Sequence, residues 1–299
     1  MKILLFGKQG QVGWELQRAL SPLGEVVALD RRGASGLCGD LADLDGLADT
    51  VRRVAPQVIV NAAAYTAVDK AEGEPDLAQT INADAPGALA RAAKGLDAWL
   101  VHYSTDYVFN GHGTRAWREE DPTGPLNVYG LTKRQGEQAI RAVAGKHLIL
   151  RTCWIYGARG NNFAKTMLRL ASERNRLTVI DDQIGAPTGA DLIADVTAHL
   201  IRAAQRHAEA GGLYHLAAAG ETSWHGYARF VIDFARQRNI PLTVAADAIA
   251  PVPTSAFPTP ARRPHNSRLN TRKLRETFNL VLPPWQNGVA RMLTEILEK

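Results

Sequence analysis

The sequence predicts an α/β fold in which a doubly wound parallel sheet is joined to a smaller α/β lobe. Short apolar runs alternate with segments of helical periodicity through the first half of the 299 residues. Such alternation is typical of βαβ units, whose parallel sheet is covered on both faces by helices. Right-handed crossovers between successive strands then produce a Rossmann-type sheet.

Five strands are expected along this first half, and four helices lie between them. The strand segments are rich in Val, Ile and Leu, which suits strands that are buried on both faces. They are residues 2–6, 25–30, 57–64, 99–106 and 147–152. The helical segments are residues 14–20, 47–54, 76–94 and 133–143.

The second half of the chain is less regular. Helices are expected over residues 161–174, 189–209 and 225–238, with a further strand at 212–217. Residues 247–264 hold five prolines and cannot be regular through their whole length. We expect residues 1–155 to form the first lobe, to whose sheet roughly residues 186–218 return. Residues 156–299 would then supply most of a discontinuous second lobe.

The composition excludes several classes of protein. Hydrophobic residues make up 45% and charged residues 22% of the chain, as in ordinary globular proteins. The apolar runs are far shorter than the ~20 residues of a membrane span, and MKILLFGKQG passes into glycines rather than a secretory signal. Cys38 and Cys153 lack the spacing of a zinc site or disulfide framework. These features predict a cytoplasmic protein with no membrane association.

The net charge of +5 indicates an attraction for anions or simply a mildly basic surface. Basic residues come in short groups such as Arg52 and Arg53, without a long basic tract that contains aromatic residues. Nucleic-acid binding is therefore not expected, whereas a phosphorylated small molecule remains open.

A glycine loop, GKQGQVG, follows the first predicted strand and places glycines at positions 7, 10 and 13. Gly7, Gly10 and Gly13 let the backbone approach a pyrophosphate, and the following helix offers free N–H groups at its N-terminus. A plain glycine-rich turn is the alternative. The position between a strand and a helix favours a dinucleotide site.

The second predicted strand ends at Asp30, close to the position expected for a ribose-binding acid. A carboxylate there accepts hydrogen bonds from the ribose hydroxyls, which favours NADH. Arg31 follows, and a guanidinium can hold the 2′-phosphate of NADPH. The sequence therefore predicts NADPH or NADH as cofactor without ranking the two.

Two segments bring reactive side chains to the carboxyl edge of the predicted sheet. The fourth strand ends in Ser104 and Thr105, and YGLTK places Tyr129 and Lys133 on one helical face. In the reduction of a carbonyl, Tyr129 can protonate the oxygen to which Thr105 donates a hydrogen bond. We expect the ammonium of Lys133 to lower the pKa of Tyr129. An ordinary surface pair is the alternative interpretation.

Several blocks of sequence, from residue 1 to about 295, resemble one family. They are LLFGKQGQVGWEL, VNAAAYTAVDKAE, HYSTDYVF, NVYGLTK, NNFAKTMLRLA, DDQIGAPTGADL and RPHNSRLNT. Together they resemble the dTDP-4-dehydrorhamnose reductases, a branch of the extended short-chain dehydrogenase/reductase family. The resemblance implies NAD(P)H-dependent reduction of the C4 keto group of dTDP-4-dehydro-β-L-rhamnose to dTDP-β-L-rhamnose. This reaction is the last step in making a precursor of cell-surface polysaccharides such as the lipopolysaccharide O-antigen.

The resemblance also implies roles for particular residues. Tyr129 is the proton donor, Lys133 is its partner and a ligand of the nicotinamide ribose, and Thr105 orients the carbonyl. The implied contacts of the cofactor are Gly10, Gln11 and Val12 at the pyrophosphate, Asp30, Asp40 and Leu41 at the adenosine half, and Ala64, Tyr65 and Thr66 along the pocket. The implied contacts of the sugar nucleotide are Thr105, Asp106 and Trp154.

Further expectations rest on the resemblance alone. Members of the family pair into homodimers, in some cases with Mg²⁺ near the interface, and Glu15 is the candidate ligand. No dense carboxylate cluster in the sequence calls for a metal. Arg262, Arg263 and Ser267 suit a diphosphate, although for either arginine solvation at the surface is the simpler reading.

Two other functions remain open. A related nucleotide-sugar epimerase or dehydratase would recycle its hydride, but a dehydratase needs a second acid beside Thr105, where the sequence has only Asp106. A non-catalytic subunit that binds NADP(H), like the regulatory subunit of methionine adenosyltransferase, would have the same fold. Intact Thr105, Tyr129 and Lys133 favour catalysis over that alternative.

Overall fold

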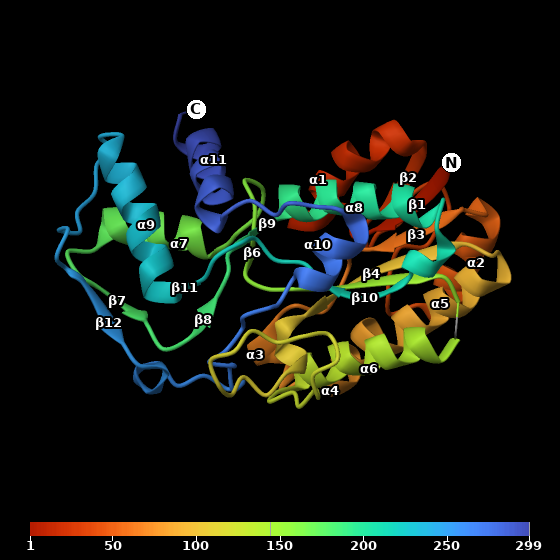
Figure 1. Ribbon diagram of the computed structural model, residues 1–299, viewed down its shortest axis with the longest axis horizontal. Coiled ribbons are helices and arrows are strands. Elements are labelled where there is room, and N and C mark those ends of the chain that lie inside the picture. The colour runs from red at the N-terminus through yellow and green to blue at the C-terminus, as the bar shows by residue number, and fades with distance from the viewer. Residues whose placement is uncertain (144, 299) are drawn as a thin grey trace.

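The computed structural model describes residues 1–143 and 145–298, and it has a larger and a smaller lobe (Figure 1). The larger lobe is built on a parallel sheet whose strand order is β10-β5-β4-β3-β1-β2. These strands are β1 (Lys2–Phe6), β2 (Glu25–Leu29), β3 (Val58–Asn61), β4 (Trp99–Thr105), β5 (His147–Thr152) and β10 (Gly212–His215). The predicted doubly wound parallel sheet is confirmed.

Helices cover both faces of this sheet. One face packs against α1 (Gln11–Leu20) and α8 (Ala190–Ala204), whose Leu16, Ile193 and Leu200 are fully buried. The other face packs against α2 (Leu44–Val54), α5 (Ala85–Gly95) and α6 (Val128–Val143). The order of β strands reverses direction between β1 and β3, and a crevice at such a switch point is where doubly wound sheets bind ligands.

The predicted helix over residues 76–94 is broken into three parts. They are α4 (Pro75–Gln79), a π-helical turn η2 (Thr80–Asp84) and α5; the short α3 (Val68–Ala71) precedes them. Pro86 explains the break, because proline lacks the N–H that would bond to residue 82 and its ring crowds that carbonyl. The wider turn leaves Asn82 fully buried, with its side chain bonded to the backbone nitrogen (2.9 Å) and oxygen (3.1 Å) of Tyr65.

The smaller lobe is made of helices and short strand pairs. Its helices are α7 (Phe163–Glu173), α9 (Trp224–Gln237) and α11 (Trp285–Leu297). Its strands are β6 (Ile155–Tyr156), β7 (Leu177–Ile180), β8 (Ile184–Gly185), β9 (Thr188–Gly189), β11 (Thr222–Ser223) and β12 (Ile249–Val252). The proline-rich segment is thus partly regular, because β12 pairs in parallel with β7 even though it contains Pro251. Proline is tolerated there because β12 is an edge strand.

The chain returns to the larger lobe after it has entered the smaller one. α8 and β10 lie within residues 186–218 and pack with the large sheet. α10 (Arg272–Phe278) packs there as well, through Leu274, although it lies within residues 156–299, which are expected to form mainly the second lobe. The bounds of the two lobes stay a prediction.

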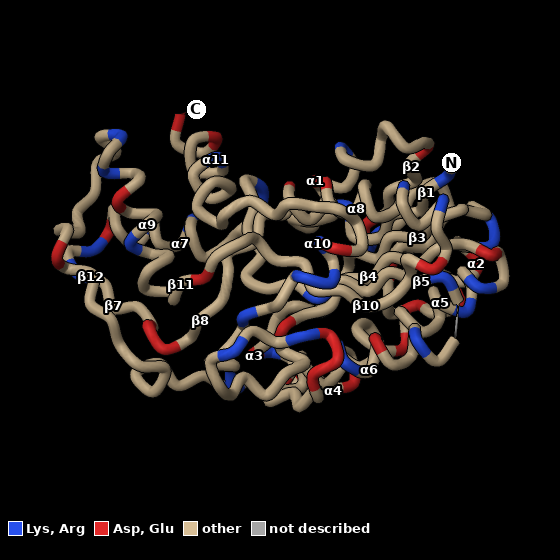
Figure 2. The backbone as a smooth tube through the Cα atoms, viewed as in Figure 1, with Lys and Arg blue, Asp and Glu red and all other residues tan. Residues whose placement is uncertain are grey.

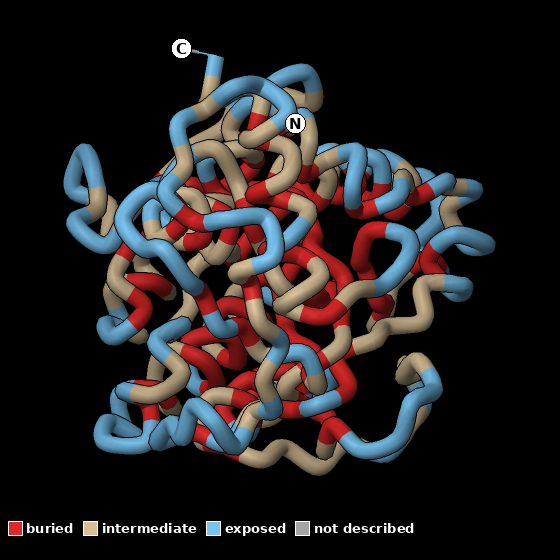
Figure 3. The backbone as a smooth tube through the Cα atoms, turned by 90° about the vertical axis from the view of Figure 1, so that its left-hand side faces the viewer, coloured by how far each residue is buried: buried red, intermediate tan, exposed pale blue. Residues whose placement is uncertain are grey.

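Charge and burial are distributed as in a globular protein. Figure 2 shows Lys and Arg interspersed with Asp and Glu along the outer segments, without a continuous basic stripe. In Figure 3 the buried stretches run through the interior, and the exposed ones form the outer loops. None of the described helices is both long enough and apolar enough to cross a membrane.

Candidate active site

The glycine loop lies at the switch point of the large sheet. Gly7 has a φ of 88°, and a Cβ atom on it would come within 2.7 Å of the Ala63 nitrogen. A Cβ atom on Gly13 would lie 2.0 Å from the Gly7 oxygen. α1 begins after Gly10 without a side-chain cap, so its first N–H groups can bind an anion. The loop therefore fits the pyrophosphate of a dinucleotide.

Gln11 and Val12 offer this loop their backbone rather than their side chains. The side chain of Val12 is buried in the core of the large lobe, and that of Gln11 accepts a hydrogen bond from Asn162 (3.2 Å). Arg159 donates to the neighbouring Gln9 at 2.8 Å. The segment that leads into α7 therefore contacts the glycine loop, and it links the smaller lobe to the cofactor side.

A cavity of about 540 Å³ extends from the glycine loop toward the end of β2. Asp30 lies in its wall, where it accepts a hydrogen bond from the Arg32 N–H (3.0 Å) and lies 3.8 Å from the Lys8 ammonium. Desolvation opposes ionisation, but these donors and charges leave the pKa of Asp30 below its ordinary value. A charged carboxylate beside cationic groups suits ribose hydroxyls and tolerates a 2′-phosphate.

The other residues predicted to contact the adenosine half line an adjoining cavity. Arg31 lies beside Asp40, with 3.1 Å between Nε and Oδ2, and it is 80% exposed. Leu41 is buried and lines a neighbouring cavity of about 460 Å³ together with Asp40. The exposure of Arg31 leaves its guanidinium free to turn toward a ligand.

Three predicted pocket residues, Ala64, Tyr65 and Thr66, line this neighbouring cavity. Tyr65 is held at its backbone by Asn82, and its hydroxyl donates to Glu74 at 2.6 Å. The hydroxyl end of this large side chain is thus fixed at Glu74. Its backbone lies along the cavity wall between those of Ala64 and Thr66.

The predicted catalytic residues meet at the carboxyl edge of the sheet. Thr105 ends β4, Tyr129 lies in the first turn of α6, and Lys133 follows one turn later. The Thr105 hydroxyl donates to Asp106 at 3.0 Å and accepts from the Tyr107 N–H at 3.1 Å. It also lies near the Tyr129 hydroxyl, and this contact lowers the pKa of the phenol. The three form a row from Tyr129 through Thr105 to Asp106.

One expectation about the Tyr129–Lys133 pair is wrong for this structure. Burial raises the pKa of Tyr129 to about 12, and the bond to Thr105 offsets only part of that rise. The Lys133 ammonium donates to the Tyr103 carbonyl (2.6 Å) and lies 3.2 Å from His102 Nε2. Burial lowers the pKa of Lys133 to about 8, while the Glu137 carboxylate acts in the opposite sense. The amine is turned to β4 rather than to the phenol.

A buried ion pair behind Lys133 was missed by sequence reasoning. Glu137, one turn farther along α6, receives two hydrogen bonds from Arg151 of β5, at 2.8 and 2.7 Å, and a third from Ser104. Both charged side chains are almost fully buried, at 4% and 3% exposure. The available signal was Arg151 itself, a charge inside the apolar strand HLILRT.

Asp106 and Trp154, predicted substrate contacts, are placed differently from each other. Asp106 is buried, which raises its pKa to about 6, and it lies next to Thr105. Trp154 has a left-handed φ of 46° and stacks on Trp224 with 3.7 Å between the ring centres. Trp224 itself lines the cavity between the lobes. Sequence reasoning singled out Trp154 and missed Trp224.

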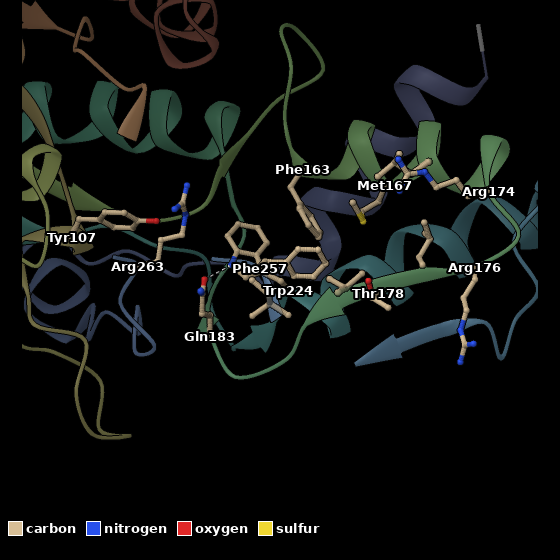
Figure 4. A pocket seen from close by; sticks show the side chains of 14 residues that line it. Tyr107, Phe163, Met167, Arg174, Arg176, Thr178, Gln183, Trp224, Phe257 and Arg263 are labelled. Carbon is tan, nitrogen blue, oxygen red and sulfur yellow. Dashed lines mark hydrogen bonds between the residues drawn. The ribbon is translucent and has the colours of Figure 1, made fainter. Parts of the chain in front are cut away.

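A cavity of about 530 Å³ begins at Tyr107, whose ring lies edge-on to that of Tyr129 with 5.6 Å between the ring centres, and extends into the smaller lobe (Figure 4). Tyr107 and Arg263 lie at one end, the rings of Phe163, Trp224 and Phe257 lie in the middle, and two arginines lie at the other end (Figure 4). These two are Arg174 and Arg176. The cavity therefore offers aromatic surfaces between cationic ends.

The expected contribution of Glu15 to a Mg²⁺ site is not supported. Glu15 lies 3.3 Å from Arg18, whose guanidinium also binds Asp195 at 2.8 Å. A guanidinium thus occupies the space between the carboxylates that a cation would need. The described part of the chain contains no cluster of three or more His, Cys, Asp or Glu side chains that could hold a metal. The donor set does not fit Mg²⁺.

A parallel sheet with a glycine loop at its switch point, and a Tyr and a Lys one helical turn apart beside a strand-end Thr, define a protein of the short-chain dehydrogenase/reductase class. The chain belongs to the RmlD substrate binding domain family, whose model matches residues 1–298. It is 59% identical to the dTDP-4-dehydrorhamnose reductase of Escherichia coli (strain K12), over 99% of this chain and 98% of that protein. It is 60% identical to the dTDP-4-dehydrorhamnose reductase of Salmonella typhimurium, with the same coverage.

Solved structures show the same architecture. A dTDP-4-dehydrorhamnose reductase from Clostridium acetobutylicum superimposes with a TM-score of 0.90 at 34% identity and covers all of both chains. The dTDP-4-dehydrorhamnose reductase of Bacillus anthracis, in complex with NADP, superimposes with a TM-score of 0.87 at 34% identity, over 98% of this chain and 99% of that one.

Proposed function

We propose that this protein reduces the C4 keto group of dTDP-4-dehydro-β-L-rhamnose to give dTDP-β-L-rhamnose, with NADPH or NADH as reductant. One observation carries the proposal. Thr105 at the end of β4 and Tyr129 and Lys133 one turn apart on α6 lie at the carboxyl edge of the sheet, in a chain similar over nearly its whole length to reductases of that name. The roles of Tyr129, Thr105 and Lys133 are part of this proposal.

Tyr129 is the proton donor in this reaction. When bound, the reduced nicotinamide supplies a hydride to C4 of the sugar, and negative charge develops on the carbonyl oxygen. Tyr129 gives that oxygen its proton, so that the keto group becomes a secondary alcohol. When substrate is bound, the Thr105 hydroxyl turns the proton that it otherwise donates to Asp106 to the same oxygen and fixes its direction. A phenol whose pKa is about 12 in this structure stays protonated at neutral pH, as a donor must.

Lys133 supports Tyr129 and holds the cofactor. Its amine lies one turn from Tyr129 on α6, and it can reach the hydroxyls of a nicotinamide ribose bound over the sheet edge. In this structure the amine bonds to the Tyr103 carbonyl, so its support of Tyr129 acts through the ribose hydroxyls that it holds rather than directly on the phenol. Gly7 and Gly13 let the loop and α1 pack closely, because a Cβ atom on either would meet backbone atoms, and this packing holds the N-terminus of α1 where the pyrophosphate would bind.

The interlobe cavity holds the sugar nucleotide. Its aromatic residues Phe163, Trp224 and Phe257 offer faces for the base, and the hexose lies beyond the diphosphate, at Tyr129 and Thr105. Arg263 at the catalytic end suits the diphosphate, because a guanidinium binds phosphate oxygens through two hydrogen bonds. Asp69 currently holds Arg263 at 3.0 and 2.7 Å, which orients the guanidinium along the cavity wall. Asp106 and Trp154 support the sugar end.

The first test is the oxidation of NADPH and NADH, followed by absorbance, with enzymatically prepared dTDP-4-dehydro-L-rhamnose. Wild type should oxidise the cofactor, and Tyr129→Phe should lose roughly 10²–10⁴-fold in kcat, the usual share of a general acid, while it still binds NADPH. A wild-type protein that binds NADPH but leaves it unoxidised would point instead to a non-catalytic subunit. Retention of full activity in the variant would remove Tyr129 from the mechanism.

The cellular setting follows from the same family resemblance. We infer a cytoplasmic homodimer, which light scattering on the purified protein and fractionation of cells can test. Cys38 and Cys153 are both unpaired thiols, which suits a reducing compartment.

A further inference from the structure

Lys133 faces a row of two buried polar side chains that the reaction scheme does not use. His102 of β4 lies 3.2 Å from Lys133 through Nε2, and Asn61 of β3 lies 3.2 Å from the other ring nitrogen, Nδ1. Asn61 and His102 are each 1% exposed, and Lys133 is 2% exposed. Three polar side chains therefore form one row beneath the catalytic edge of the sheet, away from water.

The hydrogen-bond roles along this row are constrained. Burial and the neighbouring ammonium hold the pKa of His102 well below its ordinary value, so the ring is neutral and has one donor and one acceptor. The Ala63 N–H donates to Asn61 Oδ1 at 3.2 Å, which turns the Asn61 NH₂ group to His102 Nδ1. The ring proton is then on Nε2 and points at Lys133 Nζ, an arrangement that suits an uncharged amine.

An ammonium on Lys133 needs the opposite arrangement. An ammonium has only donors, so His102 Nε2 must accept and the ring proton must lie on Nδ1. Asn61 then has to turn its carbonyl oxygen to that proton, which removes the acceptor from the Ala63 N–H. Ala63 lines both cofactor cavities. The charge of Lys133 is thereby linked, through two side chains, to the backbone of the cofactor pocket.

The other groups that face Lys133 favour its charged form or leave it unchanged. On α6 itself, Glu137 raises the pKa of Lys133, and its partner Arg151 of β5 shares that charge. Tyr129 lies one turn before Lys133 and is protonated at neutral pH. On η2, Asn82 bonds to Thr132 at 3.2 Å and does not titrate. His102 is therefore the one neighbour on β4 whose hydrogen-bonding role can change with the state of Lys133.

We propose that His102 is a positioning residue for Lys133: when the Asn61 carbonyl turns to accept from Nδ1, His102 Nε2 accepts a hydrogen bond from the ammonium, and the tautomer of the ring follows the charge of the amine. The proposal rests on the proposed function, in which charged Lys133 holds the nicotinamide ribose and supports Tyr129. The hydrogen bond of the Ala63 N–H in the cofactor pocket and the charge of Lys133 then change together.

Two variants at position 102 and one control test this role. His102→Leu removes the acceptor, whereas His102→Gln keeps one near the position of Nε2. Thr197→Val is the control, because it removes a buried hydrogen bond to the Tyr103 hydroxyl (2.7 Å) on the opposite face of β4. For each protein, kcat, the KM for the dTDP-sugar and the NADPH dissociation constant are measured across a pH range centred on about 8, where Lys133 titrates.

His102→Leu should lose activity at lower pH than wild type. Without an acceptor the ammonium is less stable, so the pKa of Lys133 falls and the active form disappears sooner as the pH rises. We expect a shift of about one pH unit and a roughly tenfold lower kcat in the shifted range, with NADPH binding weakening over the same range and little change in KM for the sugar. In His102→Gln, activity should be lost at the same pH as in wild type or at a higher pH. In Thr197→Val it should be lost at the same pH as in wild type.

If kcat falls at the same pH in wild type and in both position-102 variants, the proposal is overturned. If His102→Leu fails to fold, His102→Phe, which also lacks an acceptor, takes its place: activity lost at lower pH than in wild type supports the role, and an unchanged profile contradicts it. Absence of turnover by wild type would overturn the proposed function instead. The pH dependence of NADPH binding would then still test whether His102 sets the charge of Lys133.

Discussion

Lys133 lies in a nearly dry place, and the residues around it offset the cost of carrying a charge there. A buried ammonium without acceptors would shed its proton. The Tyr103 carbonyl accepts directly from it at 2.6 Å, and the Glu137 carboxylate acts through space. Glu137 is in turn neutralised by Arg151. A buried pair of this kind adds little net stability, but loss of one partner leaves the other charge uncompensated.

Glu137→Gln should therefore have two effects. It leaves the Arg151 guanidinium buried without a counter-charge, which we expect to lower the free energy of unfolding by about 3–5 kcal/mol. It also removes the carboxylate that raises the pKa of Lys133, so activity should be lost at lower pH than in wild type. Urea unfolding and the pH profile of kcat measure these effects. Glu173→Gln, which breaks an exposed pair with Arg169, is the matched control and should change neither.

Asp30 should determine the preference between the two cofactors. Asp30→Ala removes the acceptor for ribose hydroxyls and a charge that repels a 2′-phosphate. We expect the ratio of kcat/KM for NADPH over NADH to rise about tenfold, which corresponds to about 1.4 kcal/mol. Arg31→Ala should move this ratio in the opposite direction. If the ratio of kcat/KM for NADPH over NADH changes in the same direction in both variants, these roles of Asp30 and Arg31 at the ribose are wrong.

The residues that were predicted and those that were missed differ in how local their signal is. Tyr129 and Lys133 lie four positions apart, so a short motif contains both. The ion pair of Glu137 with Arg151 joins residues fourteen positions apart, and His102 meets Lys133 across thirty-one. No local pattern marks such pairs, because only the packing of α6 on β4 and β5 brings them together. The rise in the pKa of Tyr129 was missed for the same reason.

At the scale of elements, the position of α1 depends on one missing side chain. A Cβ atom on Gly13 would lie 2.0 Å from the backbone oxygen of Gly7, a contact that no rotamer can relieve. α1 would have to move away from the loop, and its first N–H groups would move with it. The strand, the glycine loop and the helix thus act as a single anion site.

Gly13→Ala should therefore weaken NADPH binding by more than tenfold and lower stability as well. Gly95→Ala provides the comparison, because a Cβ atom at the end of α5 meets no atom within 4 Å. That variant should bind NADPH normally and gain slightly in stability. Titration of NADPH by fluorescence and thermal unfolding measure both properties. Equal behaviour of the two variants would contradict the close approach of α1.

The break between α4 and α5 shows where helical periodicity alone is insufficient. The segment 76–94 has helical spacing throughout, and most of it is helical. Pro86 nevertheless forces a wider turn four residues earlier, and the polar side chain of Asn82 uses that turn to hold the backbone of Tyr65. A proline in a predicted helix thus marked a support for the cofactor pocket.

For the whole molecule, the sequence predicts the large sheet well and the interlobe cavity poorly. Buried strands and the glycine loop have strong local patterns. The cavity is lined by residues from distant segments, among them Tyr107, Phe163, Trp224 and Phe257. Each has the ordinary appearance of a core aromatic residue in the sequence. Only the return of the chain from the smaller lobe places Phe257 and Arg263 opposite Tyr107.

The whole protein should lose stability in acid because it buries neutral histidines. Burial lowers the pKa of His215 to about 3 from 6.5 and that of His102 well below 6.5. The unfolded chain binds these protons more readily, so the free energy of unfolding should fall as pH drops below 6.5, by up to about 1.4 kcal/mol per pH unit for each histidine. Asp106, whose pKa is raised to about 6, offsets part of this loss.

Chemical denaturation at several pH values measures this dependence. His215→Gln should flatten the slope between neutral and acid pH, whereas His207→Gln, at a 67% exposed side chain, should leave it unchanged. An identical slope in all three proteins would show that the buried histidines do not cause the acid sensitivity.

The return of the chain to the large sheet constrains how such proteins can diversify. β10 completes the sheet beside β5 only after the chain has already built part of the smaller lobe. Recombination at a single junction would therefore give one parent's edge strand to the other parent's sheet. New sugar specificities are more easily reached by point changes along the cavity wall than by exchange of a whole lobe between genes.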